Sequence, residues 1–544
     1  RSSRRSLLTN QAHDSIGGCS QDEVHRQMLG RYATATELAD QTTERVLERL
    51  AGLSPARTPP WDTTLDLAVF NPSPHPRRDV VRVPLDGFPL YRITYANVDV
   101  HPLSMASGTV EGYEADGRPV RLVTSDDPGR VRMVEDWPAV DVELVVEDVP
   151  AFGWRRVRLA PSEPHHDEVD DGATIDDGNG FEVHVTDDGT LSISDAGRRF
   201  EGLTAVEDLG DRGDTYDFDP VDGDPGATLR QVQVERRRHP SGIQRLVVSR
   251  TFAVPACVEP SRTRRSDELV ALTIRTEVRV APGVGRADLR VTVDNPARDH
   301  RLRLLFPTGA PVDTFTAAST FDVARRSTTR PPHEGWWHPP PETFPHQGWV
   351  SANGLIVVAP GLPEAEVTTD GTIAVTLLRA VGWLSHLELR RRPIPAGPTL
   401  VAPDAQCPDG IEARLHLRLS PTGADAEPSI AGLAAADELG LRAVAAGDEA
   451  LLSEGRSLLA IEPTAVVLSA LKPADDGDGF VVRVLNPTDE PLEARLTLDL
   501  PVRDVVSVRL DETPDGGELR RDGNRIQVPV APHALRSVRV AAGR

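Results

Sequence analysis

The first residues along the chain that could do chemistry are His13 and Asp14, in the stretch NQAHDSIGGC. Histidine is a common zinc ligand, and an adjacent carboxylate can orient a substrate hydroxyl or support a metal ligand. Cys19 and His25 follow and could complete a structural zinc site with His13. They lack the paired, closely spaced ligands of a zinc finger, so this alternative is weaker. The dipeptide alone leaves both a metal site and a chance occurrence open.

Two loops further along contain other candidates. Tyr216 lies in the acidic, turn-rich stretch DLGDRGDTYDFDP at 208–220. The spacing of its carboxylates does not fit an EF-hand, and a solvated loop is the simpler interpretation. Trp336, Trp337 and Trp349 lie in and just after a proline-rich stretch. Indole rings stack on sugar faces, but they also anchor long loops onto sheets, and we favour anchoring.

Composition restricts the function classes. The net charge of −23 argues against nucleic acid and acidic membranes as partners, because both reward a surplus of basic residues. Lys472 is the single lysine. No apolar run approaches the ~18 residues of a membrane helix. Cys19, Cys257 and Cys407 do not form a disulfide framework, which favours a cytoplasmic protein. The sequence has no glycine-rich phosphate loop, serine nucleophile elbow or paired CxxC motif.

The sequence predicts one long helix, over residues 20–51, that could position the residues of the His13 motif. Ser20 and Glu23 have the spacing of a capping box. Apolar residues then recur at helical spacing along one face, at Val24, Met28, Tyr32, Ala35, Leu38, Thr42, Val46 and Leu50. Because residues 1–12 can supply only a short neighbour, this helix is expected to need further helical partners.

From about residue 62 the hydrophobic period changes to two, with Asp-Gly, Asn-Pro and Pro-Gly turns between segments. One pattern of strand, Asn-Pro, polar turn and strand recurs three times, starting at 67, 289 and 481. We interpret it as a hairpin that arose either by internal repetition or by convergence. The pattern predicts at least three antiparallel sandwich-like modules. Their seams are expected near residues 53–61, 161–178 and 420–450.

Several segments of the chain, taken in their order along the sequence, resemble segments of glycoside hydrolase family 38, the retaining α-mannosidases. The segment NQAHDSIGGCSQDEVH resembles the family's zinc-site segment and is most similar to bacterial members, including the mannosylglycerate hydrolase subgroup. The later matching blocks are LAVFNPSPHPRRDVV, GFEVHVTDDGTLSISD with LGDRGDTYDF, TFPHQGWVSANGLIVVAPGLPEAEV, IAVTLLRAVGWLS and SLLAIEPTAVVLSALKPADDGDGFVVRVLNP. The resemblance runs from about residue 6 to the end.

The resemblance implies an enzyme with an amino-terminal α/β catalytic barrel, a helical bundle and several β-sandwich domains. It implies that His13 is a zinc ligand and that Asp14 hydrogen-bonds the hydroxyls of mannose. It further implies that Tyr216 reaches the sugar pocket and that Arg379 matches a pocket arginine. The barrel's HxHxD zinc motif is not found here. Neither the nucleophile nor the acid/base carboxylate is identified, and a retaining glycosidase needs both.

We therefore expect a mainly β chain of antiparallel sandwiches, preceded by the end of a helical bundle, with the catalytic barrel missing. The predicted divisions are 1–52 for the helical part, 62–165 for the first sandwich, 166–425 for the large sandwich and 430–544 for the terminal β-domain. The expected function is the carboxy-terminal part of a zinc-dependent α-mannosidase that acts on α-mannosides and is inactive alone. A homodimer is compatible with the family resemblance. The alternatives are a non-catalytic carbohydrate-binding or assembly protein and one subunit of a split mannosidase.

Overall fold

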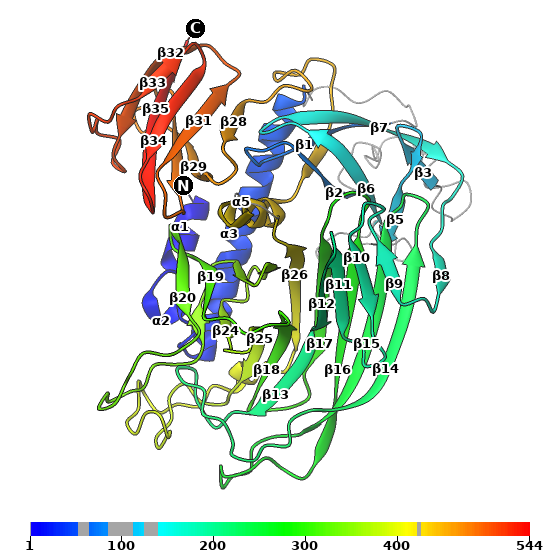
Figure 1. Cartoon of the computed structure of the whole chain (residues 1–544), viewed down its shortest axis with the longest axis vertical. Coiled ribbons are helices and arrows are strands. Elements are labelled where there is room, and N and C mark those ends of the chain that lie inside the picture. Colours follow the sequence, from blue (N-terminus) through cyan, green and yellow to red (C-terminus); the bar gives the residue numbers. More distant parts are fainter. Residues whose placement is uncertain (1, 53–64, 85–111, 125–139, 422–425, 544) are drawn as a thin grey trace, which may run out of the picture.

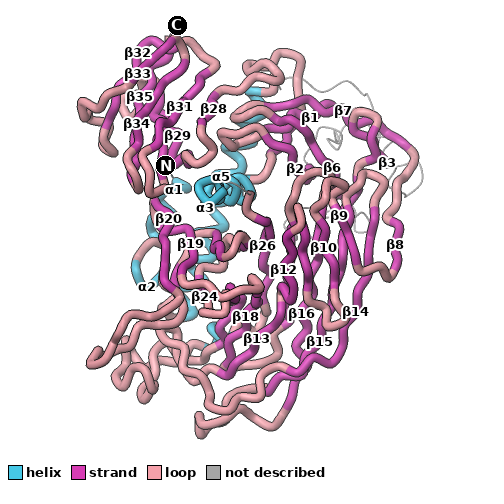
Figure 2. The backbone as a smooth tube through the Cα atoms, in the orientation of Figure 1, coloured by secondary structure: helices cyan, strands magenta, loops and turns pink. Residues whose placement is uncertain are grey.

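The computed structural model describes residues 2–52, 65–84, 112–124, 140–421 and 426–543. The fold is mainly antiparallel β with helices at the amino terminus, which confirms the predicted class (Figures 1 and 2). In the described part, no helix is long and apolar enough to cross a membrane. The three cysteines are free.

Three helices open the chain: α1 (Ser2–Thr9), α2 (His13–Ile16) and α3 (Asp22–Leu50). The predicted capping box is wrong, because Gln21 is the N-cap residue and no side chain caps the helix. Glu23 instead accepts hydrogen bonds from Arg26 and Gln27, one turn along the helix, at 3.0 and 3.1 Å. These contacts keep its carboxylate from reaching back to the helix start.

The predicted apolar face of α3 is only partly covered. Met28 and Ala35 are its buried residues, and both lie where α1 and the following turn pack on the helix. Val24, Leu38 and Val46 on the same face are exposed, Val46 by 51%. An amphipathic helix gains most of its stability by burying such a face. The described residues therefore leave much of this face without a packing partner.

The first sandwich packs two sheets, in the orders β27-β1-β7-β3-β4 and β2-β6-β5. Leu67 and Leu159 of one sheet meet Val83 and Val142 of the other in its core. Its strands are β1 (Leu65–Phe70), β2 (Arg77–Pro84), β3 (Gly112–Ala115), β4 (Arg118–Pro119), β5 (Arg121–Thr124), β6 (Val140–Val149), β7 (Trp154–Ser162) and β27 (Arg442–Ala445). The division at residue 430 stays a prediction, but β27, which lies beyond it, pairs with β1.

The central sandwich buries one large core between a ten-stranded sheet, a five-stranded sheet and a four-stranded sheet. Its long strands, green in Figure 1, bury alternate residues, as the period of two predicts. The ten-stranded sheet has β20 (Asp322–Ser327), β19 (Thr314–Ser319), β22 (Trp349–Ala352), β23 (Leu355–Val358), β26 (Ile411–Leu419), β17 (Ala287–Asp294), β16 (Leu269–Val280), β15 (Gln244–Pro255), β14 (Thr228–Arg238) and β8 (Glu168–Asp170).

The two smaller sheets of the central sandwich complete its core. The five-stranded sheet has β13 (Ala205–Gly210), β18 (His300–Pro307), β25 (Thr372–Ala380), β24 (Glu364–Val367) and β21 (Phe344–Pro345). The four-stranded sheet has β12 (Arg198–Leu203), β11 (Leu191–Asp195), β10 (Glu182–Val185) and β9 (Thr174–Asp176). A short 3-10 helix, η2 (Pro403–Gln406), and helix α5 (Ala426–Leu439) flank β26 in the sequence.

The terminal sandwich packs two four-stranded sheets around a core that includes Leu496, Ile526 and Val538. One sheet has β28 (Leu459–Glu462), β31 (Leu492–Leu498), β34 (Arg525–Val530) and β33 (Arg520–Asp522). The other has β29 (Val467–Pro473), β30 (Phe480–Asn486), β35 (Ala534–Ala542) and β32 (Val502–Val508). This unit is orange to red in Figure 1.

The three Asn-Pro repeats do not form the predicted hairpins. In each case the strand before the asparagine and the strand after it belong to different sheets of one sandwich: β1 and β2, β17 and β18, and β30 and β31. The Nδ2 of Asn71 donates to the carbonyl of His75 at 2.8 Å. The Nδ2 of Asn486 donates to the carbonyl of Glu490 at the same distance. Asn71 and Asn486 thus close turns that carry the chain across the core, and the following proline prevents continued pairing.

Candidate functional site

The acidic stretch at 208–220 is not a solvated loop. Residues 211–220, which we name the aspartate loop, follow β13 at the end of the five-stranded sheet. Asp211 is buried, and its Oδ2 accepts hydrogen bonds from Arg379 of β25 at 2.8 and 3.1 Å. Its other oxygen accepts the Gly213 N–H at 2.8 Å. A Cβ at Gly213 would lie 1.9 Å from the carbonyl oxygen of Asp217, so only glycine fits this turn.

Asp214 organises the middle of the aspartate loop from a fully buried position. Its Oδ1 accepts the N–H groups of Tyr216 and Asp217, both at 3.0 Å. Its Oδ2 accepts the N–H of His386 at 2.7 Å and pairs with Arg392. Backbone donors and a buried ion pair therefore converge on one carboxylate, which fixes the conformation of the residues on either side of Tyr216.

Tyr216 is held between this network and the 385–400 segment. Its hydroxyl packs close to Gly397, because a Cβ at that glycine would lie 3.1 Å from it. The Arg392 guanidinium lies 5.8 Å from the centre of the tyrosine ring. Burial raises the pKa of the Tyr216 phenol, and a thiolate at Cys19 and the Asp14 carboxylate would raise it further. The amino-terminal segment is thus close enough for its charges to act on Tyr216.

The His13–Asp14 segment reaches the aspartate loop through Cys19. The Cys19 Sγ lies 3.8 Å from the carbonyl oxygen of Thr215, the residue before Tyr216. Burial raises the pKa of the Cys19 thiol, and the Asp14 carboxylate adds to that rise. Residues almost 200 positions apart in the sequence therefore lie in one region.

His13 and Asp14 both face outward from α2. The His13 side chain is 95% exposed and that of Asp14 is 59% exposed, with His13 Nε2 at 3.4 Å from Asp14 Oδ1. Within the described ranges, neither side chain has a further hydrogen bond or ion pair, so both are available to a ligand.

Helix α3 fixes this segment onto the central sandwich. Arg26 forms an ion pair with Asp404 of η2 at 2.8 Å, and the Asp404 N–H donates to Asp22 at 3.0 Å. Asn10, at the start of the motif, is fully buried and donates to the carbonyl of Met28 at 3.1 Å. Neither Asn10 nor the loop aspartates were predicted from the sequence to have a role. The quoted motif begins at Asn10, so a buried polar anchor could have been sought there.

The structure brings three of the four predicted site residues together and places the fourth behind them. The segments that carry His13, Asp14 and Tyr216 meet at the Cys19–Thr215 contact, whereas Arg379 is directed at Asp211 and at the Asp214 carbonyl. Although burial lowers the pKa of Arg379, the Asp211 carboxylate outweighs this effect and the pKa is raised. The guanidinium thus supports the loop that carries Tyr216, and binding of substrate by any of the four residues stays a prediction.

The described residues do not form a complete metal site. They contain no group of three histidine, cysteine or acidic side chains placed to hold a metal ion. The alternative site made of His13, Cys19 and His25 is therefore not formed. A zinc site needs three or four ligands in fixed geometry, and His13 with Asp14 offers at most part of that set.

Of the three tryptophans in and after the proline-rich stretch, only one anchors it to the sheet as expected. Trp349 on β22 is buried and anchors the segment, as predicted, but Trp336 and Trp337 are 57% and 73% exposed. The loop is instead fixed by polar contacts, among them His338 with Asp217 of the aspartate loop at 3.2 Å. The exposed indole pair belongs to a loop joined to the candidate site.

Comparison with known proteins decides the family. Residues 178–405 match the glycosyl hydrolases family 38 C-terminal domain, and residues 465–538 match the C-terminal beta sandwich domain of the same family. The chain belongs to glycoside hydrolase family 38. A putative mannosylglycerate hydrolase from Halalkalibacterium halodurans is 27% identical to it, over 89% of this chain and 57% of that protein.

Solved structures of this family have the same fold. An α-mannosidase from Enterococcus faecalis V583 superposes with a TM-score of 0.76 at 23% identity, covering 99% of this chain and 63% of that one. A second family 38 protein from Enterococcus faecalis gives a TM-score of 0.75 at 24% identity, covering 99% of this chain and 65% of that one. The chain thus spans about three fifths of the length of the proteins it matches.

Proposed function

We propose that this chain is the carboxy-terminal portion of a retaining, zinc-dependent hydrolase of α-mannosides, and that His13, Asp14 and Tyr216 are its contribution to the sugar and metal site. The observation that carries the proposal is the approach of the His13–Asp14 segment to the aspartate loop through Cys19 and Thr215. Family membership supplies the reaction class.

His13 is proposed to be one ligand of a shared zinc ion. Its exposed imidazole is available to a ligand, and the Asp14 carboxylate beside it can orient the ring or a substrate hydroxyl. When bound, zinc would hold hydroxyl groups of the sugar and orient it for attack. The other ligands must come from residues that the described part does not bring to His13.

Tyr216 and Asp14 are proposed to contact mannose hydroxyls from opposite sides of this region. Tyr216 is fixed by Asp214 through its backbone, so its ring would be preorganised for the sugar. Arg379 is proposed to act as a positioning residue through Asp211, because two of its guanidinium nitrogens already donate to that carboxylate.

The exposed apolar residues around the motif support a docked partner domain. Leu8, Ile16, Leu29 and Val46 are all at least half exposed on α1 to α3. We propose that the family's amino-terminal catalytic domain packs on these helices and supplies the nucleophile, the acid/base carboxylate and the remaining zinc ligands. On this basis the 544-residue chain alone is inactive.

The substrate class is proposed from the relatives. One matched protein is a putative mannosylglycerate hydrolase and another is an α-mannosidase, so mannosylglycerate-type compounds and short α-mannosides are both candidates. A second function, non-catalytic carbohydrate binding, is favoured by the exposed pair Trp336 and Trp337, since indole rings stack on sugars.

A turnover experiment tests the proposal. The purified chain is assayed with p-nitrophenyl α-mannoside and zinc, alone and joined to the catalytic domain encoded upstream or by a separate gene. We expect no hydrolysis by the chain alone and hydrolysis after joining. Robust hydrolysis by the chain alone would refute the shared site. If no catalytic domain restores turnover and the chain still binds mannosides, the binding protein is favoured.

A further inference from the structure

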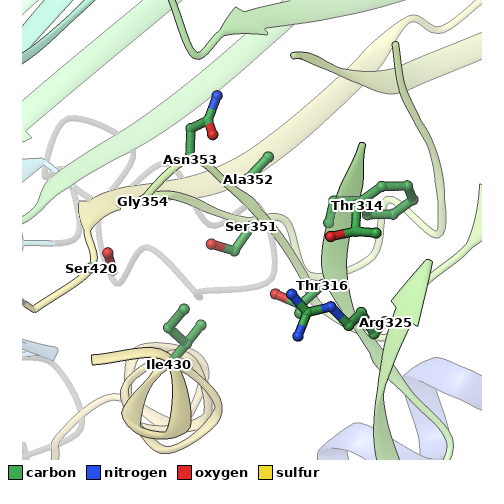
Figure 3. Close-up of a pocket in the computed structure, with 10 residues that line it drawn as sticks. Thr314, Thr316, Arg325, Ser351, Ala352, Asn353, Gly354, Ser420 and Ile430 are labelled. Atoms are coloured by element: carbon green, nitrogen blue, oxygen red, sulfur yellow. The ribbon is translucent and has the colours of Figure 1, made fainter. Parts of the chain in front are cut away.

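A second cleft, far in sequence from the His13 motif, lies where one end of the ten-stranded sheet meets α5. It has a volume of about 170 Å³, and we name it the Arg325 cleft. Figure 3 shows its lining residues, which come from β19, β20, the β22–β23 turn, the end of β26 and α5: Thr314, Phe315, Thr316, Arg325, Ser351, Ala352, Asn353, Gly354, Ser420 and Ile430.

A polar row crosses the sheet in this cleft. Thr316 pairs with Arg325 on one neighbouring strand and with Ser351 on the other, so the three side chains share one face. In Figure 3 the Arg325 guanidinium extends across Thr316 toward the space between Ser351 and Ile430. Within the described residues, the hydroxyls of Thr314, Thr316 and Ser351 form no side-chain hydrogen bond. They are available to a ligand as donors and as acceptors.

Arg325 is the charged residue among those that line the cleft. The chain has a net charge of −23, yet the exposed Arg325 has no ion-pair partner among the described residues. Arg198 lies behind Ser420, to whose carbonyl it donates at 2.5 Å, and its Nε is buried with no hydrogen-bond partner. Gly354 makes room for this arrangement, because a Cβ there would lie 3.1 Å from both Arg198 and Ser420.

We propose that the Arg325 cleft binds a small hydroxylated carboxylate. The guanidinium of Arg325 suits a carboxylate, which it can grip with two parallel hydrogen bonds. The hydroxyls of Thr316 and Ser351 would pair with hydroxyls of the same ligand. The volume corresponds to about five or six water molecules and is well below that of a drug-sized site, which favours a ligand of three or four carbons. This site does not depend on the proposed mannosidase function.

Titration calorimetry of the 544-residue chain with glycerate tests the site, with propionate as the matched probe that lacks hydroxyls. For a ligand of this size we expect a Kd of about 1 mM for glycerate. Propionate should bind at least about fivefold more weakly, because it cannot use the hydroxyl row. Equal affinity for the two probes would overturn the role of the hydroxyls.

Three variants locate the binding. Arg325→Ala should weaken glycerate binding about tenfold or more, and Thr316→Val should weaken glycerate but not propionate. Arg520→Ala, at an exposed arginine of the terminal sandwich, is the control and should leave the affinity unchanged. Unchanged melting temperatures verify folding. An unaltered Kd in Arg325→Ala, or no binding to the unmodified chain at about 10 mM glycerate, tenfold above the expected Kd, would overturn the proposal.

Discussion

Substitution of Asp214 by alanine should release the aspartate loop and with it Tyr216. The carboxylate is fully buried and accepts three backbone N–H groups, from Tyr216, Asp217 and His386. It also pairs with Arg392, which would keep its contacts with Asp217 and with the carbonyl of Ile394. Alanine would leave these donors without an acceptor in a water-poor environment.

The expected cost follows from the burial. Removal of one partner of a buried ion pair costs about 3–5 kcal/mol, because the remaining charge and donors stay desolvated. Asp222 is the matched control in the adjoining turn: it also pairs with an arginine, Arg390, at 2.7 Å, but its side chain is 86% exposed. An ion pair this exposed adds little to stability, because water screens the two charges. Asp214→Ala should therefore destabilise strongly where Asp222→Ala does not.

Hydrogen exchange measured by mass spectrometry is the suitable assay, because a chain with several sandwiches need not unfold in a single step. Amides of residues 211–220 should exchange at least about 100-fold faster in Asp214→Ala than in the unmodified chain, since ~1.4 kcal/mol of local opening corresponds to a factor of ten. Equal exchange in the Asp214 and Asp222 variants would refute the reasoning.

Three further predictions follow from the fold. The carboxylates of Asp322 and Asp489 bond to His533 and raise its pKa, so its contribution to stability is complete at acidic pH and is lost as pH rises through the raised pKa. His533→Ala should therefore lower the melting temperature more at pH 6 than at pH 9. An equal loss at both pH values would contradict this. Joint replacement of Trp336 and Trp337 by alanine should leave the melting temperature unchanged, whereas Trp349→Ala should cost about 3–5 kcal/mol in urea titrations. Asn486→Ala should destabilise the terminal sandwich by about 2 kcal/mol, seen as faster exchange of its amides, and unaltered exchange would contradict its structural role.

The β architecture was predictable from the sequence because a period of two and turn residues are local signals. The Asn-Pro turns show the limit of such signals. Asn71 and Asn486 mark where a strand ends, but pairing or crossing of the next strand depends on which faces must be buried, and that is decided across the whole sandwich. The capping box at Ser20 failed for a similar reason, since Glu23 has better partners on its own helix.

The candidate site was predictable only in part. His13, Asp14 and Tyr216 were singled out by resemblance to the family, and the structure brings their segments together. The buried aspartates of the aspartate loop were not predicted. An acidic, turn-rich stretch is typical of a solvated loop, and the sequence does not show that arginines from distant strands lie beside it. Arg379 is an example: its partner Asp211 is 168 residues away in the sequence.

Zinc content tests directly whether His13 is a zinc ligand of the complete enzyme. Three proteins are compared, each joined to the catalytic domain: the unmodified chain, His13→Ala and His25→Ala. Each is dialysed against trace zinc, and its metal content is measured by mass spectrometry. His25 lies on the neighbouring helix and is the matched control. We expect one zinc per complete enzyme, retained in His25→Ala and lost, together with turnover, in His13→Ala. Full zinc content and turnover in His13→Ala would contradict it.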